Sequence, residues 1–213
     1  MSLLLFVHHA EQVVLLTDTL ATTPEGDPFI YTSKSWPVPH MRFVMAGAGI
    51  AALHEAWYRR LQTAMLARDI DMAAAHTPTV LRQLWVDLQA DHGSLPGSST
   101  VYHFGIPEGA DHFVRHAFRS DTNFETERYD VGGLGVKPVP SFDVGSPRSV
   151  DDLIDLAVRI RAEQDSKPKP ERVHIGGDLV LSILTASGSS VSTVHRFADY
   201  DEMWQAMHDR LVD

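Results

Sequence analysis

The sequence predicts an α+β fold, a four-layer α/β/β/α sandwich of two antiparallel sheets. Strand-like stretches come in groups before and after a pair of helical stretches, whereas a parallel sheet needs strands that alternate with helices. The helical stretches are apolar along one face, which suits them to cover a sheet. No repeat or low-complexity tract divides the 213 residues. Residues 1–213 are therefore predicted to form a single domain.

The first third of the chain is predicted to be strands. Residues 2–8 and 13–17 are apolar and partly β-branched, and His9-Ala10-Glu11-Gln12 separates them as a hairpin-like break. Turn-forming residues fill 22–28. Residues 29–33 and 42–46 are predicted to be two further strands.

Two helices are predicted next. Over 51–68, apolar residues recur every four positions, at Leu53, Trp57, Leu61 and Met65. This spacing puts them on one helical face, as core or subunit-contact residues. A second helix is predicted over 78–89, with Thr77 as its N-cap before Pro78.

The second half returns to strands at 100–106 and 113–118. Residues 129–140 are rich in glycine and proline and are predicted to end in a loop. A third helix is predicted over 149–164, with Ser149 as its N-cap. A hairpin of strands 179–186 and 191–197 follows, and a short helix over 201–211 ends the chain.

Composition excludes several classes of function. The chain has no cysteine, which rules out disulfides and thiolate metal sites and suits a cytoplasmic location. Its net charge of −10 disfavours nucleic acid and anionic membrane as partners. No run approaches the roughly 20 apolar residues of a membrane span. His112 and His116 lie four apart but in a predicted strand, without a third ligand nearby, so no metal site is predicted.

Four segments together resemble the proteasome β-subunit-like branch of the N-terminal nucleophile (Ntn) hydrolases. Val13–Thr19 resembles the family's strand that ends in an aspartate, and Val44–Gly49 resembles its glycine-bearing segment before the first helix. Ile175–Gly188 and the helix before it resemble the family's C-terminal strand and helix. Asp18 and Lys34 follow Ser2 by 16 and 32 positions, which are the family's distances from nucleophile to aspartate and lysine.

The resemblance implies a hydrolase of peptides or small amides that needs no cofactor or metal. Ser2, exposed by removal of Met1, would be the nucleophile, and its own amino group the base. Lys34 would tune that amine, Asp18 would orient Lys34, and the Gly47 N–H would form the oxyanion hole. The family assembles through its helical layers, so homo-oligomers are expected, with a ring as one form of assembly.

The chain also departs from the family. Accessory family residues are replaced by Leu20, Gly133, Arg172 and Ile175. Turnover would then need a substitute such as His8, His9 or His174. Otherwise the chain is a catalytically inactive subunit that self-assembles as a scaffold or binding protein. A small-molecule binder with a cleft between the sheets is a third reading. Asp18 could equally cap a turn, and Lys34 could be a strand-edge lysine.

Overall fold

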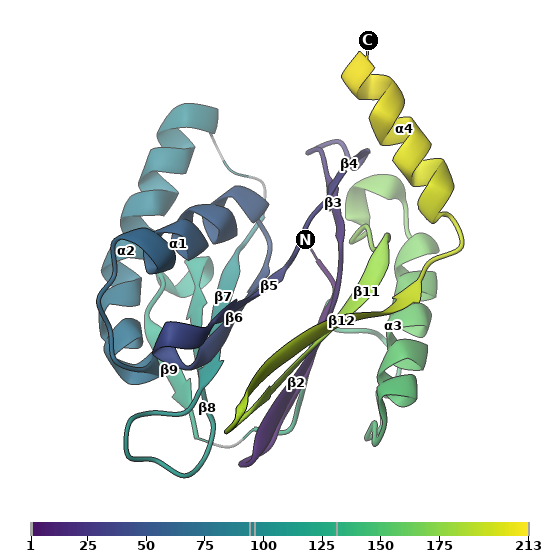
Figure 1. Ribbon diagram of the computed structural model, residues 1–213. Helices are drawn as coiled ribbons and strands as arrows, with labels where there is room; N and C mark the ends of the chain where they lie inside the picture. Colours follow the sequence, from purple (N-terminus) through teal and green to yellow (C-terminus); the bar gives the residue numbers. More distant parts are fainter. Residues whose placement is uncertain (1, 94, 96, 131, 213) are drawn as a thin grey trace.

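The computed structural model describes residues 2–93, 95, 97–130 and 132–212 (Figure 1). Its strands form three antiparallel sheets. The first sheet has the order β10 (Leu134–Lys137), β1 (Leu4–His8), β2 (Gln12–Asp18), β11 (Asp178–Thr185) and β12 (Gly188–Arg196). The small second sheet pairs β3 (Leu20–Thr22) with β4 (Pro28–Tyr31). The third has the order β5 (Ser35–Val38), β6 (Phe43–Ala48), β7 (Thr100–Gly105), β8 (Val114–Arg119) and β9 (Thr126–Tyr129).

Four helices lie outside the two large sheets (Figure 1). Helices α1 (Ala51–Thr63) and α2 (Ile70–His92) pack on the third sheet. Helix α3 (Val150–Asp165) packs on the first sheet. Helix α4 (Tyr200–Val212) contacts β4 of the small sheet, where Tyr200 stacks on Tyr31 with ring centroids 4.6 Å apart.

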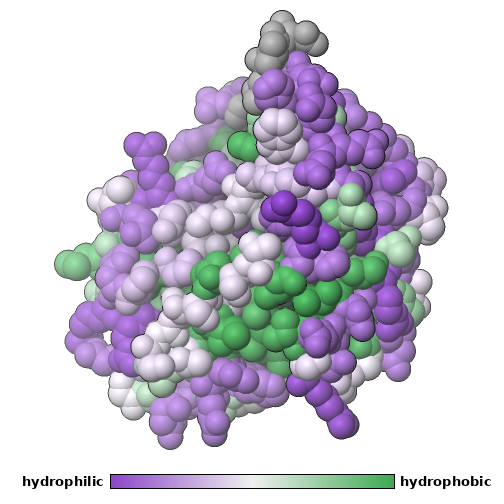
Figure 2. All heavy atoms as spheres, turned by 45° about the vertical axis from the view of Figure 1, so that its right-hand side comes forward, coloured by the Kyte–Doolittle hydropathy of each residue, from purple (hydrophilic) through white to green (hydrophobic). Residues whose placement is uncertain are grey.

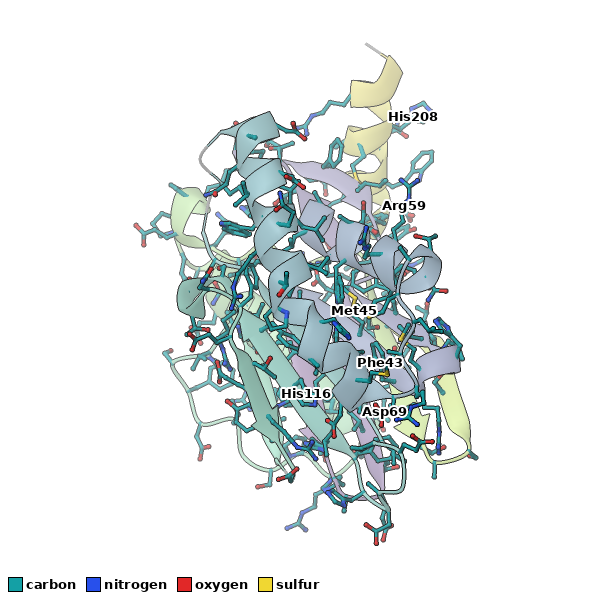
Figure 3. All side chains as sticks on the ribbon, turned by 90° about the vertical axis from the view of Figure 1, so that its left-hand side faces the viewer. Phe43, Met45, Arg59, Asp69, His116 and His208 are labelled. Carbon is teal, nitrogen blue, oxygen red and sulfur yellow. The ribbon has the colours of Figure 1, made fainter. Side chains whose placement is uncertain are left out.

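Alternation along the strands gives each large sheet two apolar faces. Leu4, Phe6 and Leu15 of the first sheet meet Val44 and Phe104 of the third in a core between the two sheets. The opposite faces are covered by helices. On the third sheet, Phe43 and Met45 lie beneath α1 and α2 (Figure 3) and contact the buried helical residues Leu53, Trp57 and Leu61. These three were predicted to be core or subunit-contact residues, and the structure places them in the core.

The predicted fold class is wrong. The strands form three sheets of five, two and five strands, not the two sheets of an Ntn-type four-layer sandwich, and the fold is rich in β-structure. Leu20–Thr22 and Pro28–Tyr31 pair with each other around the turn between them, so they make a sheet of their own. Helix α4 packs against this small sheet. Strand periodicity does not say which strands pair, and this is why the prediction failed.

Two local predictions were also wrong. The second helix begins at Ile70, eight residues earlier than predicted, because the Asp69 side chain accepts a hydrogen bond from the Met72 amide and caps it. Thr77 is therefore no N-cap, and its hydroxyl donates to the Ala73 carbonyl in mid-helix. Pro78 lies inside the helix.

The supposed loop at 129–140 contains the edge strand β10. This strand was not predicted, because Gly135 lies in the middle of it and glycine is uncommon in strands. A Cβ at Gly135 would collide with the Phe6 ring of the neighbouring strand β1, so the missing side chain lets that ring pack across β10. The pairing puts Lys137 opposite Leu4, close to the start of the described chain.

Other elements match their predictions within a few residues. These include β1, β2, the β11–β12 hairpin, α3 and α4. The Ser149 hydroxyl accepts from the Asp152 amide, and the Asp152 side chain accepts from the Ser149 amide, so α3 begins with a complete capping box. In the described ranges, no helix is both long and apolar enough to cross a membrane.

Candidate functional site

The centre of the candidate site is a buried ion pair between Asp18 and Lys34. Asp18 ends β2, and Lys34 directly precedes β5. The Lys34 Nζ donates to Asp18 Oδ1 at 2.6 Å and to the Leu20 carbonyl at 2.6 Å. The side chains of Lys34 and Asp18 are 7% and 0% exposed, so water contributes almost nothing to their solvation. Burial lowers the pKa of Lys34, and the Asp18 carboxylate opposes that shift.

Asp18 joins three distant parts of the chain. Besides Lys34, its carboxylate accepts from the Leu3 amide at 3.0 Å and from the Gly176 amide at 3.1 Å. The aspartate therefore fixes the backbone directly after Ser2 as well as the ammonium of Lys34. Three of the four predicted site residues, Ser2, Asp18 and Lys34, are brought together in this way.

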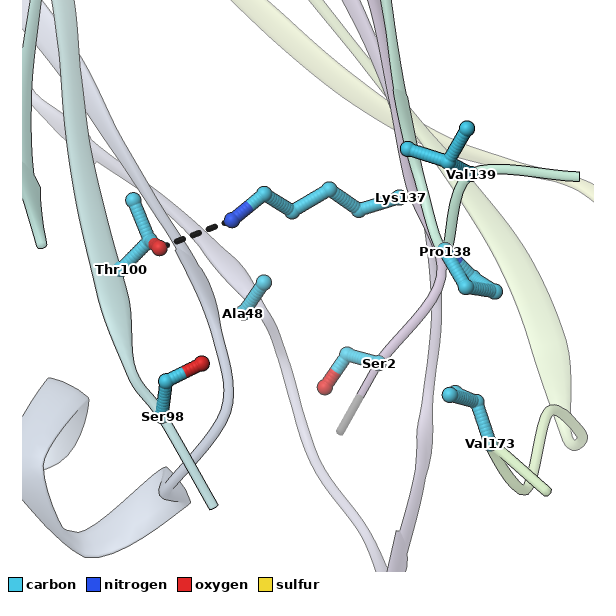
Figure 4. A pocket seen from close by; sticks show the side chains of 8 residues that line it. All are labelled: Ser2, Ala48, Ser98, Thr100, Lys137, Pro138, Val139 and Val173. Atoms are coloured by element: carbon cyan, nitrogen blue, oxygen red, sulfur yellow. Dashed lines mark hydrogen bonds between the residues drawn. The ribbon is translucent and has the colours of Figure 1, made fainter. Parts of the chain in front are cut away.

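Ser2 opens into a cavity of about 250 Å³ between the two large sheets (Figure 4). The serine is 8% exposed. Apolar side chains line one part of the cavity, namely Ala48, Pro138, Val139 and Val173. Its polar lining consists of Ser2, Ser98, Thr100 and Lys137. In Figure 4 the hydroxyls of Ser2 and Ser98 point into the space between them.

Gly47, the fourth predicted residue, is in a less open position. Its N–H donates to the Lys34 carbonyl at 3.0 Å, which continues the pairing of β5 with β6. An oxyanion would have to compete with that carbonyl for the same proton. A side chain at this position would be strained, because a Cβ would collide with the imidazole of His54.

Sequence reasoning missed His54. This residue lies on the apolar face of α1, behind Gly47, and is fully buried. Its Nε2 and the Ser99 hydroxyl are 3.0 Å apart. Burial lowers the pKa of His54 to about 3, so the ring is neutral at physiological pH. Its position three residues before Trp57 and seven before Leu61 puts it on their helical face and could have indicated burial.

Sequence reasoning also missed Lys137, because the strand that carries it was taken for a loop. Lys137 ends β10, and its Nζ donates to the Thr100 hydroxyl at 2.8 Å across the cavity (Figure 4). Burial lowers the pKa of this ammonium. The cavity beside Ser2 is thus lined by a lysine, Lys137, that is distinct from Lys34 of the buried ion pair.

The histidines proposed as substitute bases are not assembled around Ser2. His8 ends β1, six residues from Ser2, which is about 20 Å along an extended strand. Its Nε2 is 2.9 Å from the Phe113 carbonyl. His9 follows it and is exposed. His174 packs against Gly26 in the turn of the small sheet.

The histidine pair at 112 and 116 is separated by its partners. His112 contacts Asp111, whereas His116 Nε2 lies 2.7 Å from Asp71 Oδ1 of α2. No group of three histidine, aspartate or glutamate residues with metal-binding geometry occurs in the described part of the chain.

Comparison with known proteins adds no assignment. No protein-family model matches this chain, and no curated protein sequence matches it either.

Proposed function

We propose that the chain hydrolyses amide bonds, with the Ser2 hydroxyl as nucleophile once Met1 has been removed. The observation that carries this proposal is the buried Asp18–Lys34 pair, whose carboxylate also holds the Leu3 amide next to Ser2. Two charges buried in a fold are costly, and well-packed apolar residues often replace such a pair without loss of stability. A catalytic role next to Ser2 would account for the presence of this costly buried pair.

The first chemical step follows from the groups around Ser2. The Ser2 oxygen attacks the amide carbonyl carbon, and its proton passes to the free α-amino group of the same residue. That amine suits the task, since its ordinary pKa of about 8 lies near the working pH. A nearby Lys34 ammonium lowers the amine's pKa further by repulsion between like charges.

Collapse of the tetrahedral intermediate completes acyl transfer. The C–N bond breaks, the α-amino group returns its proton to the leaving amine, and the acyl group stays on Ser2 as an ester. Water then hydrolyses the ester, with the same amine as base. An ammonium has three N–H donors, and Asp18 and Leu20 take two of those on Lys34. The third has no acceptor within the described residues, and in this mechanism it holds the Ser2 oxygen in place.

Covalent labelling tests this function. The purified chain would be treated with a β-lactone or epoxyketone and analysed by intact mass spectrometry and peptide mapping. We expect loss of Met1 and one adduct on Ser2, absent from Ser2→Ala. Ser98→Ala is the matched control, because Ser98 lines the same cavity yet has no assigned role in the reaction. Retained Met1 with no adduct would refute the proposal.

A second candidate function is a non-catalytic binding or scaffold protein. One observation favours it: the Gly47 N–H is already bonded to the Lys34 carbonyl, so no oxyanion donor is preformed there. In that case the cavity would bind a ligand without turnover. The labelling experiment separates the two functions.

We also propose that the chain forms homo-oligomers, in a reducing compartment such as the cytoplasm. The lack of cysteine supports the compartment. Apolar surface on the side that carries α3 supports self-association (Figure 2). There, Val7, Val14, Ile183 and Val194 of the first sheet are only partly buried. Light scattering at micromolar concentration should give a multiple of 23.6 kDa, whereas the monomer mass would contradict association.

A further inference from the structure

The cavity beside Ser2 contains a cation that spans the gap between two sheets. Lys137 stands on β10 of the first sheet, and its hydrogen-bond acceptor Thr100 stands on β7 of the third. Figure 4 shows the lysine side chain crossing the cavity toward Thr100. Ser2 lines the same cavity. A ligand held by Lys137 would therefore share its space with the proposed nucleophile.

Among the residues that the structure describes, this ammonium has no carboxylate in direct contact. Within the described residues, no carboxylate oxygen lies within 4.0 Å of Lys137 Nζ, whereas Lys34 has Asp18. Its recorded contacts are the neutral Thr100 hydroxyl and the face of Tyr102, whose ring centroid is 5.6 Å away. Three charged groups act on Lys137 from a greater distance, namely Arg119, which is paired with Glu127, and the carboxylates of Asp121 and Glu127. A half-buried ammonium whose direct contacts are neutral is stabilised by an anion that contacts it.

Apart from the hydroxyls of Ser2, Ser98 and Thr100, the rest of the lining is apolar. Ala48, Pro138, Val139 and Val173 offer only carbon to a ligand. A cavity of about 250 Å³ is just below the usual size range of small-molecule sites, so it suits a compact ligand. An apolar wall with a single cation fits an anion that carries a short hydrocarbon chain.

We propose that this cavity recognises a carboxylate on a small apolar ligand, with the Lys137 ammonium and the Thr100 hydroxyl as its anchors. This assignment deepens the proposed function and, for turnover, rests on it: the substrates are small amides that carry a free carboxylate. Lys137 then determines specificity and takes no part in the bond-breaking step. The carboxylate accepts hydrogen bonds from Lys137 Nζ and from the Thr100 hydroxyl. It replaces the Thr100 oxygen as the acceptor of the lysine's hydrogen bond.

Binding can be measured without turnover. Hexanoate and its neutral analogue hexanamide would be titrated into the Ser2→Ala chain by isothermal titration calorimetry at pH 7. We expect hexanoate to bind about tenfold more tightly or better, as is typical of a charge-assisted hydrogen bond. Lys137→Met should abolish this preference, Thr100→Val should weaken it, and Lys137→Arg should retain it. Lys167→Met, which removes a surface lysine near Glu163, should leave it unchanged.

Equal affinity for the two probes, absence of hexanoate binding, or a preference that survives Lys137→Met would each overturn the inference. Thermal unfolding of each variant checks that the fold is retained. Failure of this inference is distinct from failure of the proposed function. Labelling of Ser2 without a preference for the acid would refute only the role of Lys137. A preference that depends on Lys137, without labelling of Ser2, would refute only the hydrolase.

Discussion

Removal of the Lys34 charge tests the buried ion pair most directly. Lys34→Met keeps the length and apolar stem of the side chain but leaves the Asp18 carboxylate buried, with only the Leu3 and Gly176 amides as partners. Breaking a buried pair on one side typically costs about 3–5 kcal/mol, because one charge stays in the interior without compensation. For a chain of this size, that loss corresponds to a fall in Tm of roughly 6–20 °C.

The double variant Asp18→Asn, Lys34→Met should be compared with the single variant Lys34→Met. Because it removes both charges and keeps the shapes of the side chains, it should recover much of the stability lost in Lys34→Met. Urea denaturation at pH 7 measures the free energy of unfolding of the wild type, both single variants and the double variant. In Lys34→Met, the loss should also shrink as the pH falls, since the stranded carboxylate can take up a proton.

The reasoning fails if Lys34→Met costs less than about 1 kcal/mol, the usual value of an exposed ion pair. It also fails if the double variant is as unstable as the sum of the two single variants. Either result would mean that water reaches the pair. The mechanism proposed for Ser2 would then lose the rigid ammonium on which it depends.

Two further predictions concern Gly47 and the buried histidines His54 and His103. Gly47→Ala should destabilise the fold by about 1–3 kcal/mol, because its Cβ would collide with the His54 ring; urea denaturation checks this, and an unchanged free energy of unfolding would contradict the close packing. Burial lowers the pKa values of His54 and His103 to about 3, so the unfolded chain binds more protons than the folded chain below pH 6.5. Stability should therefore be present well above pH 6.5 and should fall as the pH drops below it, with a slope that approaches about 1.4 kcal/mol per pH unit for each histidine near pH 5. His103→Gln keeps an acceptor for the Trp57 indole N–H. It should remove the contribution of one histidine from the slope of stability against pH. An unchanged slope would show that His103 has the same pKa in the folded and unfolded chains.

Local structure was largely predictable from the sequence, because its signals are local. The Ser149 capping box, the helical spacing of Leu53, Trp57 and Leu61, and the break before Gln12 each act within a few residues. They gave α3 and the β1–β2 hairpin close to their observed positions, and they gave the start of α1, although α1 ends at Thr63, five residues before the predicted end.

Pairing between distant strands was not predictable in the same way. Nothing in Leu20–Thr22 indicates that it pairs with Pro28–Tyr31 in a separate sheet. Gly135 does not indicate a strand either, because its role is to leave space for the Phe6 ring of another strand. These features depend on contacts that a periodic pattern does not encode.

The candidate site shows the same division. The spacing of Asp18 and Lys34 from Ser2 predicted that the two side chains act together. In the structure, Lys34 Nζ and Asp18 Oδ1 are 2.6 Å apart. Lys137 was invisible from the sequence, because it reaches the cavity only through the pairing of β10 with β1. His54 was hidden among the apolar residues of its helix face.

The strand order of the two large sheets also sets the sequence of events during synthesis on the ribosome. All five strands of the third sheet, with α1 and α2, come from the continuous stretch 35–129, so this half can fold from neighbouring segments as soon as they emerge. In the first sheet, β2 lies between β1 and β11, and Asp18 accepts one of its hydrogen bonds from the Gly176 amide. That sheet waits for residues 176–185, and the long loop it closes makes it the slower half. The cavity at Ser2 therefore takes shape only after most of the chain has been made, so the site proposed for hydrolysis is not assembled while the nascent polypeptide is incomplete.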